Sequence, residues 1–151
     1  VLGLADEADI EAEYQRDHTA LGAENAARAR AARPDAEAKA RAWRLILDDT
    51  ELSNRQLAAT AEGFWQPEQG DLTHSYVQRY FVEMPAMARR RTRQVALYLV
   101  SSGFPMFAVE PATLEAGQAL LARDDVSPVL RRVVVDSSDE IRRALAARAL
   151  T

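Results

Sequence analysis

The sequence predicts an all-α fold, a superhelix of antiparallel helix pairs with about eight or nine helices. Three observations support this prediction. Apolar residues recur at helical spacing along nearly all of the 151 residues. No segment alternates apolar and polar residues with the two-residue period of a half-buried strand. Proline, glycine and capping residues interrupt the chain at short intervals, which gives helices of about one to four turns joined by short loops.

Three helices are expected in the first third of the chain. Asp6 can cap the first, which runs to about Arg16. The chain restarts at Thr19 into an alanine-rich helix that ends near Arg33. Pro34 suits the first turn of a third helix, because proline lacks the N–H that would be unsatisfied there. The apolar stripe predicted for this third helix is Ala36, Ala40, Trp43 and Leu47.

The fourth helix has the clearest start signal. Ser53-x-x-Gln56 forms a capping box, and the helix is expected to stop near Gly63. The next helix carries Leu72, Tyr76, Tyr80 and Met84 at spacings of four residues, and Pro85 is expected to kink or restart it.

Four helices are expected in the remaining sequence. Residues 95–100 are apolar on all sides, which predicts a central helix covered on most of its surface and ended by Gly103 and Pro105. Pro111 opens the next helix, with Leu114, Gly117 and Leu121 on one face, and Pro128 opens another that carries Leu130, Val133 and Val134. Ser137-x-x-Glu140 offers a capping box for a last helix, Ile141 to about Leu150.

Composition excludes several classes of protein. A net charge of −4 and a pI near 5.2 argue against nucleic acid as a partner, since binding to nucleic acid generally requires a basic face. With no cysteine there is no disulfide or thiolate–metal framework. The longest apolar run, residues 95–109, is interrupted by serine, glycine and proline and is too short to span a membrane.

No residue pattern indicates a catalytic, cofactor-binding or metal site. His18 and His74 are far apart and have no histidine four residues away, so we expect them to face solvent or cap a helix. The serine pairs 101–102 and 137–138 have no nucleophile-elbow context, and we interpret them as a helix end and a helix cap. The carboxylate pairs 48–49 and 124–125 fit solvated turns.

The charged and aromatic residues each allow two interpretations. Seven acidic residues between Asp6 and Glu24 precede six basic residues between Arg28 and Arg44, which fits solvated helix faces with pairs such as Glu37–Arg41. The alternative is an arginine that holds a peptide carboxylate, with residues 89–93 as the first candidates. The aromatic residues fit a core better than a ligand pocket; they are Trp43, Phe64, Trp65, Tyr76, Tyr80 and Phe81.

Several collinear segments resemble the helical C-terminal domain of aminopeptidase N enzymes, which are M1-family zinc metallopeptidases. They are 32–43 (ARPDAEAKARAW), 52–54 (LSN), 63–69 (GFWQPEQ), 76–85 (YVQRYFVEMP) and 130–134 (LRRVV). The resemblance extends from Gly3 to Ala149 and is strongest to the actinobacterial branch, consistent with 18 arginines against one lysine.

The resemblance implies that the parent protein is a cytoplasmic, zinc-dependent enzyme that removes N-terminal residues from peptides. Its zinc-binding His-Glu-x-x-His helix and its Gly-x-Met-Glu-Asn loop are absent here, so no catalytic or metal residue carries over. The chain would be the later part of the C-terminal domain, a HEAT-like superhelix that encloses the substrate chamber and packs on the catalytic domain. Without the preceding helices, the helix after Asp6 is expected to support weak homodimerisation.

A second hypothesis comes from a different class of protein. The same fold would suit a standalone helical-repeat module that binds a protein partner, because fold alone does not determine function. The two hypotheses differ in genetic context, since a standalone module would have its own start codon near Val1.

Overall fold

The computed structural model describes residues 5–48 and 50–150, which form eight α-helices and one short 3-10 helix, with no strand among them. The predicted all-α class is therefore confirmed. Contacts divide the chain into two compact units, Val1–Thr73 and His74–Thr151. The single repeat domain and its superhelical arrangement stay predictions.

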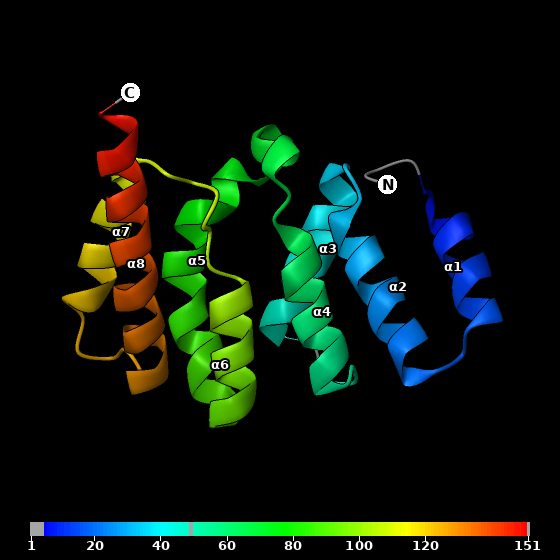
Figure 1. Ribbon diagram of the computed structural model, residues 1–151. Coiled ribbons are helices and arrows are strands. Elements are labelled where there is room, and N and C mark those ends of the chain that lie inside the picture. Colours follow the sequence, from blue (N-terminus) through cyan, green and yellow to red (C-terminus); the bar gives the residue numbers. More distant parts are fainter. Residues whose placement is uncertain (1–4, 49, 151) are drawn as a thin grey trace. The chain divides into compact units, whose positions relative to one another are not determined.

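The first unit is a helical cluster centred on one alanine-rich helix. Its elements are α1 (Glu7–Arg16), α2 (Ala20–Ala32), α3 (Ala36–Asp48), α4 (Asn54–Phe64) and η1 (Pro67–Gln69). Helix α2 contacts α1, α3 and α4, and it lies beside α1 in Figure 1. Gly63 allows α4 to approach α2 closely, because a Cβ at this position would lie 2.3 Å from the Arg28 carbonyl oxygen.

The second unit contains the later helices. Helix α5 (Gly70–Arg90) begins in the first unit and lies mostly in the second, and it is followed by α6 (Arg93–Ser102), α7 (Pro111–Leu121) and α8 (Pro128–Arg148). Helix α8 contacts both α6 and α7. At the α7–α8 contact, a Cβ on Gly117 would lie 3.0 Å from Ser138 Oγ, so only a very small residue fits there without a shift of its neighbour.

Most of the predicted helix starts are confirmed. Asp6 and Ser53 each accept a hydrogen bond from the third residue of their helix, and the side chains of Asp9 and Gln56 accept hydrogen bonds in return. Thr19 caps α2, and Pro111 and Pro128 lie in the first turns of α7 and α8. These local signals work because they satisfy N–H groups that no helical partner can reach.

The prediction for the third helix was wrong in its start and in most of its buried face. Helix α3 begins at Ala36, and Asp35 Oδ1 accepts a hydrogen bond from the backbone N–H of Ala38 at 2.7 Å, so Pro34 lies outside the helix. The buried residues of α3 are Ala38, Lys39, Ala42, Trp43 and Ile46, and only Trp43 belongs to the predicted stripe. The buried face of α3 therefore includes Lys39, a residue that lies outside the predicted apolar stripe.

The final helix also differs from the prediction. Ser137-x-x-Glu140 does not start a new helix, because α8 continues from Pro128 to Arg148. Its buried residues Leu130, Val134, Ser138 and Ile141 follow at spacings of four, four and three, so packing on one face extends through the serine pair. Helix α5 likewise continues through Pro85 without a restart.

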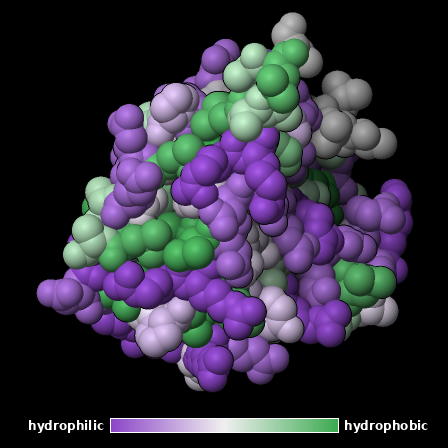
Figure 2. Space-filling view, turned by 60° about the vertical axis from the view of Figure 1, so that its left-hand side comes forward, coloured by the Kyte–Doolittle hydropathy of each residue, from purple (hydrophilic) through white to green (hydrophobic). Residues whose placement is uncertain are grey.

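Helix α6 is covered on one side only. Val95, Ala96, Leu99 and Val100 are buried, as the sequence suggests, but Leu97 and Tyr98 are 45% and 49% exposed. The prediction of a helix covered on most of its surface was therefore wrong. Figure 2 shows a face of the molecule on which apolar side chains lie between hydrophilic ones.

The aromatic residues belong to the core, as predicted, but they form a separate cluster in each unit. In the first unit, the Phe64 ring packs 5.1 Å from Trp43 and 4.9 Å from Trp65, measured between centroids. In the second, Tyr80 packs edge-on against Phe81 and Phe104. The Tyr80 hydroxyl donates a hydrogen bond to the Val100 carbonyl at 2.6 Å, and burial raises the pKa of this phenol far above its usual value.

A buried lysine links the ends of two helices in the first unit. Lys39 is fully buried, and its Nζ donates hydrogen bonds of 2.8 Å to the carbonyl oxygens of Ala31 in α2 and Phe64 in α4. Both acceptors lie in the last turns of their helices, where carbonyls have no helical partner and carry partial negative charge. Burial lowers the pKa of Lys39 from 10.5 to about 8, although the carboxylates of Asp35 and Glu68 oppose the shift.

This lysine predicts an unusual pH dependence for the first unit. Between pH 8 and 10.5 the unfolded chain holds the Lys39 proton and the folded chain has released it, so the free energy of unfolding rises with pH. The rise should approach about 3 kcal/mol relative to Lys39→Met, at 1.36 kcal/mol per pKa unit. Urea unfolding followed by tryptophan fluorescence isolates this unit, because Trp43 and Trp65 both lie in it.

The comparison with Lys39→Met provides the control, since the two proteins differ at this one residue. A difference in unfolding free energy that stays constant or falls between pH 8 and 10.5 would contradict the assignment.

Candidate functional site

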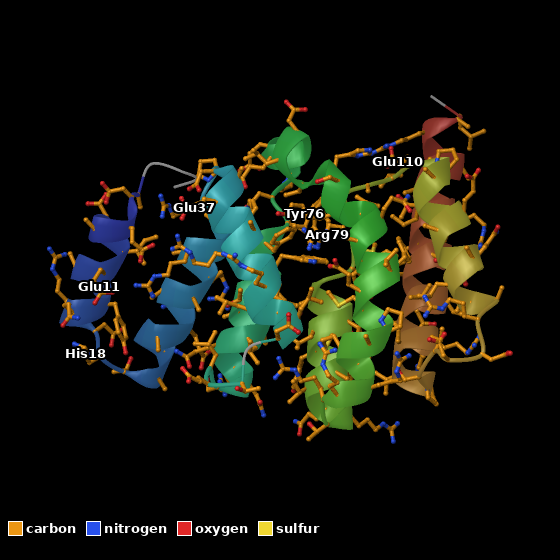
Figure 3. All side chains as sticks on the ribbon, turned by 180° about the vertical axis from the view of Figure 1, so that it is seen from behind. Glu11, His18, Glu37, Tyr76, Arg79 and Glu110 are labelled. Carbon is orange, nitrogen blue, oxygen red and sulfur yellow. The ribbon has the colours of Figure 1, made fainter. Side chains whose placement is uncertain are left out.

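The two histidines lie in different units, and both are exposed. His18 Nε2 is 2.8 Å from Gln15 Oε1, and its ring packs 4.8 Å from the Tyr14 ring (Figure 3). His74 Nδ1 lies 3.7 Å from Glu110 Oε1 ahead of α7. Over residues 5–48 and 50–150, no group of three or more histidine, cysteine, aspartate or glutamate side chains could hold a metal ion.

The two serine pairs lie in helices α6 and α8. Ser101 and Ser102 are the last residues of α6, so their interpretation as a helix end is confirmed. Ser137 and Ser138 lie inside α8 rather than at its cap, and Ser138 is buried against Gly117.

The carboxylate pair at residues 124–125 contributes an ion-pair network. Arg123 binds Asp125 through Nε and Nη2 at 2.8 and 2.7 Å, and Arg89 Nη1 lies 3.0 Å from Asp125 Oδ2. The hydrogen bonds from Arg123 lower the pKa of Asp125 to about 2, so this carboxylate is ionised at neutral pH and is unsuited to general acid catalysis. Asp49 of the other pair lies outside the described residues.

Charged residues at the start of the chain pair between helices as well as within them. The predicted Glu37–Arg41 pair is present at 2.9 Å. In addition, Arg30 of α2 reaches Glu7 and Glu11 of α1 at 2.6 and 2.7 Å. The acidic first helix is thus matched to the basic second helix. The signal for this pairing was the reversal of charge between adjacent helices.

The arginines at residues 89–93 have at least two roles. Arg89 belongs to the Asp125 network and also donates to the Asp125 carbonyl at 2.9 Å. Arg91 and Arg93, by contrast, line a hollow of about 940 Å³ in the second unit, together with Arg132 of α8. Sequence reasoning missed Arg132, although the spacing from Pro128 places it in the first turns of a helix.

Tyr76, one of the aromatic residues discussed from the sequence, makes a cation–π contact on α5. The guanidinium carbon of Arg79 lies 4.9 Å from the centroid of the Tyr76 ring, and the two side chains lie close together in Figure 3. Arg79 also pairs with Glu83 at 3.1 Å. Tyr76 is buried, so this contact is part of the packing on α5.

No helix in the described part of the chain is both long enough and apolar enough to cross a membrane. The two longest described helices, α5 and α8, have 21 residues each.

Comparison with known proteins indicates the family of this chain. Residues 1–143 match the family described as "ERAP1-like C-terminal domain". The chain is also 38% identical to aminopeptidase N of Streptomyces lividans over 141 residues, which is 93% of this chain and 16% of that protein. The chain therefore spans about one sixth of the curated relative it matches. On this evidence the chain belongs to the family of ERAP1-like C-terminal domains, as found in an aminopeptidase N.

Proposed function

We propose that this chain is an accessory segment of a zinc-dependent aminopeptidase N that removes N-terminal residues from peptides. It would form the later part of the C-terminal domain, enclose the substrate chamber and contact the catalytic domain of the same parent chain. The observation that carries the proposal is the 38% identity to Streptomyces lividans aminopeptidase N across 93% of the chain.

In this proposal the chain has a non-catalytic role. Over residues 5–48 and 50–150, no group of three or more histidine, cysteine, aspartate or glutamate side chains could hold a metal ion. Zinc and its ligands therefore belong, in this proposal, to the rest of the parent protein. The proposal also includes a cytoplasmic location for the parent.

The proposal is tested by the coding DNA upstream of the Val1 codon. We expect a continuous reading frame that encodes Gly-x-Met-Glu-Asn and, further along, His-Glu-x-x-His, because those motifs supply the amine-binding loop and the zinc ligands of a metallo-aminopeptidase. As a control, the isolated chain should not hydrolyse aminoacyl chromogenic substrates with or without added zinc. A start codon within a few residues of Val1 would instead support the standalone helical-repeat module.

Weak self-association through the first helices is a further part of the proposal. Ile10, Tyr14 and Ala26 line an open, mainly apolar hollow of about 290 Å³ between α1 and α2. Leu21, near the start of α2, is 60% exposed. Exposed apolar surface at the end of a helical array favours association with a second copy.

Self-association predicts an average molar mass in solution that increases with protein concentration. Light scattering should show a weight-average mass that rises above 16.7 kDa with concentration. Leu21→Glu should reduce the rise, because association would bury the new charge. Val82→Glu is the matched control, since Val82 is 68% exposed but lies in the second unit. A strict monomer at every concentration would count against self-association.

A further inference from the structure

Three arginines from separate parts of the second unit line one hollow. Arg91 lies between α5 and α6, Arg93 is the first residue of α6, and Arg132 lies on α8. The hollow has a volume of about 940 Å³. This volume is within the range of sites that bind small organic molecules and is far more than one inorganic ion requires.

Arg91 has a polar atom without a partner. Its Nη2 is buried and makes no hydrogen bond among the residues that the structure describes. Two other arginines of this unit have acceptors, since Arg123 binds Asp125 and Arg131 donates to the carbonyls of Leu121 and Arg123. A buried guanidinium nitrogen without an acceptor is unfavourable, and an oxygen of a bound anion would remove that penalty.

The charges around the hollow favour an anion. Among the described residues, none that lines it is acidic, and Asp136, which lies 3.7 Å from Arg132 Nε, does not line it. Ser127, the N-cap of α8, lies at its edge, so the positive end of a 21-residue helix also faces this region. Three cations together favour a dianion over a single carboxylate.

The remaining lining is largely apolar. Ala96, Leu97 and Val129 contribute to it, and Leu97, on the uncovered side of α6, is 45% exposed. An organic group attached to the anion would cover this apolar surface, which the anion itself cannot do.

We propose that this hollow is a binding site for a phosphorylated small organic molecule. The phosphoryl oxygens accept hydrogen bonds from Arg91, Arg93 and Arg132, and the organic group lies against Leu97 and Val129. The site is separate from the proposed peptidase role, because binding here requires neither zinc nor peptide hydrolysis.

Isothermal titration calorimetry of the 151-residue chain tests the site, with phenyl phosphate as the probe at fixed ionic strength. We expect saturable binding at one site. Inorganic phosphate, which lacks the organic group, and benzoate, which lacks the second charge, should each bind at least about tenfold more weakly. Arg91→Met should weaken phenyl phosphate binding at least about tenfold, since it removes a charge-assisted hydrogen bond. Arg143→Met, an exposed arginine elsewhere on α8, should change it less than about twofold.

Four outcomes would overturn the proposal. They are the absence of saturable binding, equal losses in Arg91→Met and Arg143→Met, inorganic phosphate binding as tightly as phenyl phosphate, and tighter binding of benzoate or of a tripeptide with a free carboxylate. The last outcome would reassign the hollow to peptide carboxylates. Circular dichroism confirms folding of each variant, and Arg132→Ala replaces Arg91→Met if that variant does not fold.

Discussion

The first unit depends on one amine that occupies the point where two helices end. Helices α2 and α4 terminate with carbonyl groups in the interior, where water cannot satisfy them. Lys39 Nζ donates to one carbonyl from each helix, and its ammonium lies 5.4 Å from the centroid of the Phe64 ring. Gln69 continues the arrangement, because its Nε2 donates to the Ala32 carbonyl at 2.9 Å. Side-chain hydrogen bonds, rather than turns, thus satisfy these carbonyls at the ends of α2 and α4. A neutral amine still has two N–H donors, so both hydrogen bonds survive loss of the proton.

Local chemistry explains which parts of the fold could be predicted from the sequence. Caps such as Asp6 and Ser53, and prolines such as Pro111 and Pro128, act within one turn of helix and therefore leave a local signal. Contacts between helices that are distant in the sequence leave no such local signal. The buried face of α3 was mispredicted because it includes a lysine. Lys39 is polar, and its burial depends on an acceptor far away in the sequence, the carbonyl of Phe64. The continuation of α8 through Ser137 was missed because the small Ser138 packs on Gly117, and a capping motif cannot reveal that contact.

The candidate site was predictable only in part. The run of arginines at residues 89–93 was visible in the sequence, but its members diverge in the structure: Arg89 is held by Asp125, whereas Arg91 and Arg93 reach the hollow. Arg132 joins them across 39 positions of sequence from Arg93, a relation that only tertiary packing creates. The family, in contrast, was recognisable from collinear segments, and these contain buried core residues such as Phe64, Trp65 and Tyr80.

Amine acylation of the native chain shows whether Lys39 is buried in the core, where it joins two helix ends. Lys39 is the single lysine, so peptide mass spectrometry reports its modification without ambiguity. With a pKa of about 8, Lys39 of the folded chain holds a larger fraction of neutral amine at the same pH than an ordinary lysine does, so slow acylation would report burial of Nζ rather than protonation. We predict acylation at least about a hundredfold slower than that of a lysine model peptide at the same pH, with protection lost in the urea range where tryptophan fluorescence reports unfolding. Acylation of the native chain at the rate of the model peptide would contradict the account.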